Sequence, residues 1–232
     1  MLNDLIIAHR GLFDNIKVPE NSISAFKNAL KKNLPIELDV QLTSDNKLVV
    51  FHDESLYRMT KKKKILQETT YDELTLFNLL DTTEKIPLFK DVLKIISGKV
   101  LLDIEIKNTN KIKETCEILM NELKDYNGEY IIKSFNPKIV HYFKKHYPNV
   151  TRGLLITDNY HDKFYNKLLP SKLIRLYCKP NFLAISKKLL KRKQFKKLVK
   201  KMPILVWTVK NKNEFKTLKK DKLSLICNNL PY

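Results

Sequence analysis

Ionisable side chains alternate with apolar ones in two short segments of the chain. Glu37 and Asp39 lie two residues apart in the first segment, and Asp103, Glu105 and Lys107 alternate with isoleucines in the second. Residues two apart in a β-strand point to the same face of a sheet, so each segment would gather its charges on one side. Because buried like charges need a neutralising partner, grouped carboxylate oxygens indicate a site for a hard divalent cation. The alternative is that these charges face solvent or pair with lysines.

Two histidines could add acid–base chemistry to these carboxylates. His9 and Arg10 end a short apolar run and precede Gly11, where the backbone can turn sharply. His52 follows another apolar run. Two imidazoles beside a carboxylate cluster can divide the work of general acid and general base, and Arg10 with Lys107 would offer positive charge to a phosphate. A single histidine at a strand end is more often structural, so this interpretation requires both to lie near the carboxylates.

These residues need elements that bring them together, and the sequence predicts such elements throughout. Short apolar runs alternate with helical patterns such as residues 112–123 and 195–201, which is typical of βα units around a parallel sheet. A length of 232 residues without a Ser/Gly-rich linker favours one domain, residues 1–232, built as an α/β fold, a closed (β/α)8 TIM barrel. The last run ends five residues before the final Tyr232, so no eighth helix is expected. The predicted strands are residues 5–8, 36–40, 100–106, 130–133, 153–156, 182–185, 204–209 and 223–227.

One further run, residues 48–51, follows the second predicted strand too closely for a crossover helix. It therefore predicts an antiparallel β-hairpin. With Asp45 and Asn46 in the turn, the numbers of paired residues would sum to 91, and His52 would lie opposite Asp39. Such a hairpin would stand at the C-terminal rim of the strands, where barrel enzymes build their active sites.

Several short motifs follow one another in a distinctive order over nearly the whole chain. They are His9-Arg10-Gly11, Pro19-Glu20-Asn21-Ser22, Glu37-Leu38-Asp39-Val40, His52-Asp53 with Leu56, Arg58 and Thr60, Glu105-Ile106-Lys107, Ser134-Phe135 and Trp207-Thr208-Val209. This order resembles the glycerophosphodiester phosphodiesterase family. The resemblance implies a barrel of the phospholipase C-like phosphodiesterase type and a metal-dependent hydrolysis of glycerophosphodiesters to an alcohol and sn-glycerol 3-phosphate.

The resemblance also implies a cofactor and a role for each matching residue. The cofactor would be one divalent cation, Mg²⁺ or Ca²⁺, with Mn²⁺ as a further candidate. Two points of mechanism stay open: which histidine is the acid, and whether water or the substrate's own 2-hydroxyl attacks the phosphorus. By position, His9 and His52 match the acid–base pair, Glu37, Asp39 and Glu105 match the metal ligands, and Arg10 and Lys107 match the phosphate contacts.

Two further residues each have two interpretations. Glu20 matches a supporting residue near the substrate, yet Glu20 also suits the start of a helix capped by Asn21 or Ser22. Trp207 could stack on the glycerol or alcohol part of the substrate, or it could pack in the core.

The chain departs from the family where it replaces glycine. Asn33 and Asn46 stand at positions where the family has Gly, and asparagine tolerates the same left-handed backbone. In the last strand Cys227-Asn228 replaces a Thr-Asp pair, which affects substrate details more than catalysis.

Lysine dominates the charge of the protein. The chain has 44 basic and 25 acidic residues, a formal net charge of +19, and only five of the basic residues are arginines. Dedicated readers of nucleic acid rely on arginine, so no specific nucleic-acid partner is expected. The lysine runs at residues 61–64 and 187–201 either reflect composition alone or attract anionic membranes weakly.

Composition also bears on the compartment. Hydrophobic residues make up 43% and charged residues 30%, which excludes a disordered chain and a membrane-spanning one. Cys116, Cys178 and Cys227 are odd in number and far apart, and the N-terminus lacks a basic region with an apolar stretch. We therefore expect a cytoplasmic enzyme with a small-molecule glycerophosphodiester substrate. Two alternatives stay open: a phospholipase D or C that acts on intact lipids, and a non-catalytic barrel that binds anionic membranes.

Overall fold

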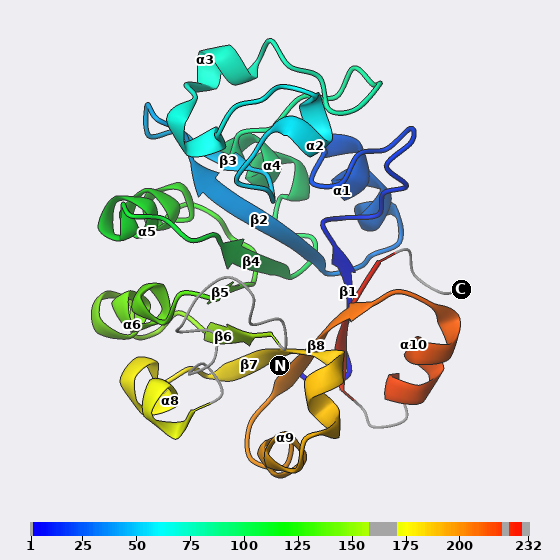
Figure 1. Ribbon diagram of the computed structural model, residues 1–232, viewed down its shortest axis with the longest axis vertical. Helices are drawn as coiled ribbons and strands as arrows, with labels where there is room; N and C mark the ends of the chain where they lie inside the picture. The colour runs from blue at the N-terminus through cyan, green and yellow to red at the C-terminus, as the bar shows by residue number, and fades with distance from the viewer. Residues whose placement is uncertain (1, 158–170, 220–222, 229–232) are drawn as a thin grey trace. The chain divides into compact units, whose positions relative to one another are not determined.

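The computed structural model describes residues 2–157, 171–219 and 223–228 of the chain (Figure 1). Contacts group the chain into an N-terminal unit, Ala8–Tyr130, and a C-terminal unit, Met1–Ile7 with Ile131–Tyr232. The elements up to residue 130 are β1 (Ile6–His9), α1 (Ile23–Lys31), β2 (Ile36–Leu42), β3 (Leu48–Val50), α2 (Tyr57–Thr60), the 3-10 helix η1 (Leu66–Glu68), α3 (Tyr71–Leu74), α4 (Phe89–Ile96), β4 (Leu102–Ile106) and α5 (Ile112–Glu122).

The elements that follow continue the alternation of strands and helices. Every predicted strand is present, and no strand end differs from its prediction by more than two residues. The remaining elements are β5 (Tyr130–Ser134), α6 (Pro137–His146), β6 (Arg152–Ile156), α8 (Lys172–Cys178), β7 (Phe182–Ser186), η2 (Lys187–Lys191), α9 (Lys193–Leu198), β8 (Ile204–Val209), α10 (Lys212–Lys219) and β9 (Ser224–Cys227).

The order of the hydrogen-bonded strands gives the fold class. It runs β1-β9-β8-β7-β6-β5-β4-β2-β3, and β1 also pairs with β2. An order that returns to its first strand is that of a closed barrel, here of eight strands with β3 attached to β2 as an antiparallel arm. The predicted (β/α)8 fold class is therefore confirmed. The expectation that no eighth helix follows the last strand falls partly on residues 229–232, outside the described residues.

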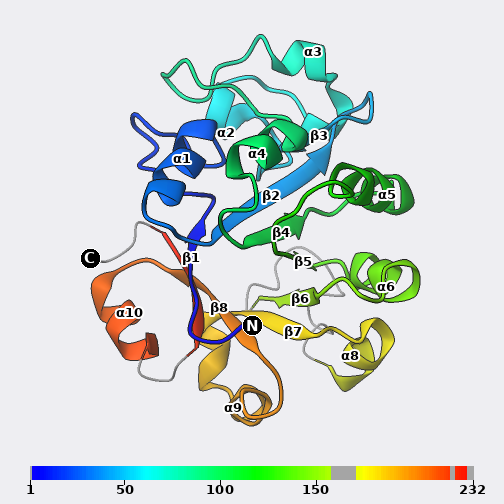
Figure 2. The ribbon, with the colours of Figure 1, turned by 180° about the vertical axis from the view of Figure 1, so that it is seen from behind.

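Strand β2 is the central element of the N-terminal unit. All seven of its residues are buried, and β1 and β4 flank it in parallel. Helix α1 packs beside α4, as both views show (Figures 1 and 2). The chain between β3 and α4 carries α2 and α3 and lies beyond β3 (Figure 1).

A close approach of backbone fixes the turn after β1. Gly11 has a φ of +79°, and a Cβ atom placed there would lie 2.8 Å from the backbone of Ala25 in α1. The side chain of Ser22 caps α1 by accepting a hydrogen bond from the Ala25 N–H. The residues just before Gly11 are thereby held against the first turn of α1, and these residues are His9 and Arg10.

The β2–β3 hairpin is confirmed, but the predicted register is wrong by one residue. Val40 pairs with Val50 and Leu42 pairs with Leu48, so the paired numbers sum to 90, and the N–H of Phe51 donates to the carbonyl of Asp39. Phe51, and not His52, therefore lies opposite Asp39.

The turn explains the difference in register. The N–H of Thr43 donates to the carbonyl of Lys47, which leaves Ser44, Asp45 and Asn46 in the turn. The hydroxyl of Thr43 accepts from the Lys47 N–H at 2.8 Å and donates to Asp45 Oδ1 at 2.6 Å. Asn46 has a φ of 59°, as expected of a glycine substitute in such a turn.

The C-terminal unit contains the parallel strands β5 to β9 and a large apolar cluster. Cys178 and Cys227 lie inside that cluster as free thiols, and burial raises the pKa of Cys178 to about 11 and that of Cys227 to about 12. Among the described residues, no helix is long and apolar enough to span a bilayer.

Candidate active site

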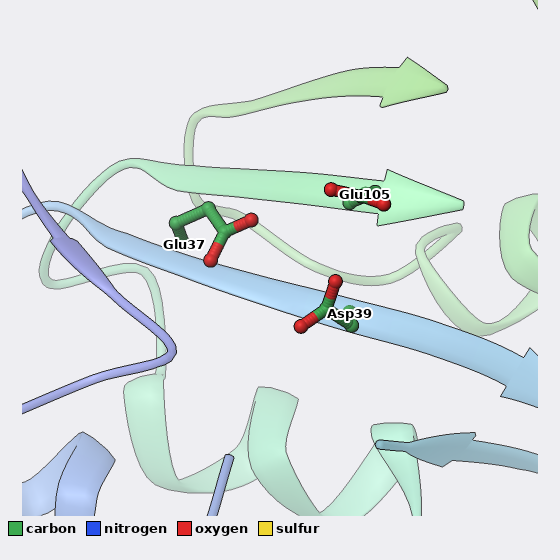
Figure 3. Close-up of side chains that lie close together, drawn as sticks. All are labelled: Glu37, Asp39 and Glu105. Atoms are coloured by element: carbon green, nitrogen blue, oxygen red, sulfur yellow. The ribbon is translucent and has the colours of Figure 1, made fainter. Parts of the chain in front are cut away.

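Three carboxylates meet on two neighbouring strands of the N-terminal unit. Glu37 and Asp39 lie on β2 and Glu105 lies on β4, and Asp39 is directly opposite Glu105 in the parallel pair. One oxygen from each residue lies within 4.8 Å of the others, and all three side chains are buried. Figure 3 shows the three side by side on their strands. The two alternating segments of the sequence thus converge on one cluster, and its charges do not face solvent.

Two cationic side chains, each less than a fifth exposed, contact this cluster. The Lys107 ammonium lies 2.7 Å from Glu105 Oε1 and 3.4 Å from Asp39 Oδ1. Arg10 Nε lies 3.3 Å from Asp39 Oδ2, and the backbone N–H of Arg10 donates to Glu37 Oε2 at 3.0 Å. Two cations do not balance three carboxylates, and a set of hard oxygen ligands is what Mg²⁺, Ca²⁺ and Mn²⁺ prefer. The residues present therefore fit a divalent cation.

Asp39 is held in its ionised form. Burial alone would raise the pKa of this carboxyl, but the charges of Lys107, His52 and Arg10, together with a hydrogen bond from Asn21, hold it well below its usual range. The Asn21 amide donates to Asp39 Oδ2 at 2.9 Å, and Asn21 adopts a φ of 58° at this position. An ionised carboxylate offers only acceptor oxygens, which is the form that ligates a metal.

The two histidines lie on different elements but near the same cluster. His9 ends β1, and its Nε2 lies 3.9 Å from Glu37 Oε2. His52 follows β3, and its Nδ1 lies 2.6 Å from Asp53 Oδ1. His52 directly follows Phe51, whose N–H donates to the carbonyl of Asp39, so the corrected hairpin register still leaves His52 adjacent to the residue opposite Asp39.

Glu20 is a partner of arginine and lies before the helix start. Helix α1 begins at Ile23 behind its Ser22 cap, whereas the buried Glu20 carboxylate accepts hydrogen bonds from Arg10 and Arg58. Burial opposes its ionisation, yet the hydrogen bonds and charges of the two arginines, with a hydrogen bond from Asn15, lower the pKa of Glu20 to about 2.

Sequence reasoning gave no role in the site to three residues that contact it, and it considered one of them, Asn21, only as a helix cap. Asn21 bonds Asp39, Asp53 bonds His52, and Arg58 bonds both Asp53 and Glu20. All three stand in the quoted motifs, and the adjacency of His52 and Asp53 was the available signal for one of them.

Trp207 lies on β8 in the C-terminal unit. Its ring meets that of Phe135 edge to face, with the centroids 5.6 Å apart and the planes at 86°. This contact accounts for part of its packing and leaves its predicted contact with substrate as a prediction.

Comparison with known proteins gives the family. The model of the glycerophosphoryl diester phosphodiesterase family matches residues 9–229. A glycerophosphodiester phosphodiesterase of Caldanaerobacter subterraneus subsp. tengcongensis is 39% identical over 165 residues, 66% of this chain and 67% of the relative. One from Bacillus altitudinis is 34% identical over 185 residues, 72% of this chain and 73% of the relative.

Solved structures agree on the fold. An Oleispira antarctica phosphodiesterase in complex with the product sn-glycerol-3-phosphate has a TM-score of 0.82 at 21% identity, with 98% of this chain and 93% of that chain covered. A glycerophosphodiester phosphodiesterase from Parabacteroides distasonis has a TM-score of 0.79 at 24% identity over the same shares of the two chains. Because the family model spans nearly the whole chain and two relatives exceed 30% identity over two thirds of their length, this chain belongs to the glycerophosphoryl diester phosphodiesterase family.

Proposed function

We propose that the protein hydrolyses glycerophosphodiesters to an alcohol and sn-glycerol 3-phosphate at the cluster of Glu37, Asp39 and Glu105. The observation that carries the proposal is the set of three buried carboxylates and two cations with two histidines nearby, in a chain of this family. Membership of the family makes the chain a phosphodiesterase, and the substrate class follows from the relatives' activity.

Glu37, Asp39 and Glu105 would hold one divalent cation, with Mg²⁺, Ca²⁺ and Mn²⁺ as the ions to compare. The chemistry that such a cation supplies at this kind of site is Lewis-acid polarisation of the phosphate. Arg10 and Lys107 would bind the charged phosphate oxygens, since both already direct donors at the cluster. Glu20 would hold the Arg10 guanidinium, and Trp207 is proposed as a contact for the glycerol or alcohol group.

His9 and His52 would move the protons. One imidazole takes the proton of the attacking hydroxyl as its oxygen forms a bond to phosphorus. The bond between phosphorus and the alcohol oxygen breaks, and the other imidazole gives a proton to the leaving alkoxide. The attacking oxygen belongs either to water or to the substrate's 2-hydroxyl, and the second route would pass through a cyclic phosphate. Detection of that cyclic phosphate in a quenched reaction would separate the two routes.

The direct test is hydrolysis of glycerophosphocholine by chelated protein with Mg²⁺, Ca²⁺ or Mn²⁺ added back. We expect turnover that depends on the added ion, with Asp39→Ala losing metal affinity and activity together. No turnover with any of the three ions would overturn the proposed function. Turnover of an intact diacyl phospholipid in its place would assign the protein to the intact-lipid alternative.

Two wider proposals accompany this function. Residues 1–232 would act as a single catalytic domain, and the protein would work in the cytoplasm, for which the buried thiols of Cys116, Cys178 and Cys227 offer support. The small-molecule substrate would be the main partner, with weak attraction of anionic membranes by the lysine-rich surface.

A further inference from the structure

A continuous set of hydrogen bonds connects His52 to Arg10. His52 Nδ1 lies 2.6 Å from Asp53 Oδ1. The Arg58 guanidinium donates from Nε and Nη2 to the two oxygens of Asp53, and from Nη1 and Nη2 to the two oxygens of Glu20 at 3.1 and 2.6 Å. Glu20 Oε1 in turn accepts from Arg10 Nη1 at 2.6 Å. Arg58 therefore joins two carboxylates, each of which contacts one residue of the site.

The contact with Asp53 decides which nitrogen of His52 carries a proton. Burial alone would raise the pKa of the Asp53 carboxyl, but hydrogen bonds and charges from His52 and Arg58 hold it below its usual range. An ionised carboxylate only accepts hydrogen bonds, so His52 Nδ1 must be the donor. In the neutral ring this leaves the lone pair on Nε2 for proton transfer.

Packing holds Arg58 in place for this purpose. Leu56 and Met59, on either side of Arg58, are buried in an apolar cluster formed by the chain from Val49 to Ile86. Helix α2 is thereby anchored, while the Arg58 side chain is 46% exposed and lies over both carboxylates. The three nitrogens of the Arg58 guanidinium make a paired contact with each of the two carboxylates, and the single nitrogen of a lysine ammonium cannot reproduce both pairs.

We propose that Arg58 is a positioning residue for hydrolysis: through Asp53 it fixes the His52 ring, and through Glu20 it fixes the Arg10 guanidinium. This inference rests on the proposed function, because it assigns proton transfer to His52 and phosphate binding to Arg10. We call the contacts through Asp53 the His52 arm and those through Glu20 the Arg10 arm. Kinetic measurements should distinguish the two arms, since the His52 arm acts on the chemical step and the Arg10 arm on substrate binding.

The first test compares the arms with glycerophosphocholine as substrate. Asp53→Ala should lower kcat by about 10- to 100-fold with little change in KM, because His52 loses its orientation. Glu20→Gln should mainly raise KM, because Arg10 loses its anchor. Arg58→Gln should do both. The matched control is Glu54→Gln, an exposed residue of the same segment, and we expect native kinetics from it.

Arg58→Lys tests geometry against charge. It keeps the positive charge but cannot form a paired contact with each carboxylate, so it should stay close to Arg58→Gln in both kcat and KM. Native kinetics in Arg58→Lys would overturn the proposal, because charge alone would then suffice. Circular dichroism of each variant checks that the fold is retained.

A readout independent of activity is the tautomer of His52 in the metal-free protein. Ring ¹⁵N resonances, assigned by their loss in His52→Gln, should indicate a protonated Nδ1 in the native protein and a mixture of tautomers in Asp53→Ala. The same resonances should change in Arg58→Gln and stay unchanged in Glu54→Gln. An unchanged tautomer in Asp53→Ala would overturn the His52 arm even if the native protein proves inactive. An inactive native protein with the expected tautomers would overturn only the proposed function.

Discussion

Asp39 on β2 and Glu105 on β4 face each other across a parallel strand pair, and the Lys107 ammonium contacts both, at 3.4 and 2.7 Å. Burial would lower the pKa of Lys107, but the charges of Glu105 and Asp39 raise it above its ordinary value. Lys107 therefore stays charged and shares carboxylate oxygens with any metal that these residues bind. Its charge neutralises the cluster and at the same time repels the cation.

Lys107→Met should separate these two effects. Without the ammonium, the three carboxylates should bind a divalent cation about tenfold more tightly, because a like charge has been removed from the site. The same change should lower kcat/KM, because the substrate phosphate loses a contact. Calorimetric titration with Mg²⁺ or Ca²⁺ measures the first effect and steady-state kinetics the second. A variant with weaker metal binding would mean that Lys107 holds the ligands in place.

His9→Ala and His52→Ala should each lower kcat by about 100-fold or more, the scale for losing a positioned general acid or base. Metal affinity should change little, since neither ring is among the three grouped oxygen ligands. The comparison of kcat with the titrated metal affinity checks both statements. Near-native turnover in either variant would make that histidine structural.

Glu122, at the end of α5, should make folding stability depend on pH. Burial raises the pKa of its carboxyl to about 7, against the opposing charge of Lys90, and its Oε2 atom is buried. The folded state thus favours the protonated acid, so stability is full below the ordinary pKa and falls as pH rises through about 7.

Glu122→Gln should therefore raise the free energy of unfolding at pH 8 by about 1–2 kcal/mol, a figure reduced for the partial exposure of the group. At pH 4.5 or below the two proteins should differ little. Urea denaturation at both pH values measures the difference, with the exposed Glu117→Gln on the same helix as the control. Equal gains at both pH values would point to packing and not to ionisation.

Local periodicity explains how much the sequence could predict. The alternation at Glu37 and Asp39 indicated a shared face because the period of a strand is two, and asparagine substitution indicated the left-handed turns at Asn33 and Asn46. The hairpin register was not predictable in this way, because the hydroxyl of Thr43 selects a three-residue turn.

The contacts of Arg58 with other segments were beyond such reasoning. Arg58 stands on a four-residue helix with no periodic pattern, and its partner Glu20 lies 38 positions earlier. That pairing follows from tertiary packing of α2, which no short motif encodes. The family resemblance included both Arg58 and Glu20 among its motifs, and the structure showed that the two side chains are hydrogen-bonded.

The lysine run after α2 should steer anionic substrates. Lys61, Lys62 and Lys63 are exposed and begin three positions after Arg58, so they lie in the unit that holds the carboxylate cluster. Lys64 is different, because it pairs with Glu73 at 2.7 Å. If the run attracts substrate, kcat/KM for anionic glycerophosphoglycerol should fall more steeply with salt than for zwitterionic glycerophosphocholine, since screening acts over about 10 Å at 0.1 M.

Changing Lys61, Lys62 and Lys63 together to glutamine should remove this difference in slope and leave kcat unchanged. The matched control changes three exposed lysines of the C-terminal unit, Lys188, Lys191 and Lys200, to glutamine and so alters the net charge equally. Because steering depends on where the charge lies and not on its total, the control should keep the difference in slope. Parallel slopes for the two substrates in the native protein would instead assign the +19 charge to composition and solubility alone.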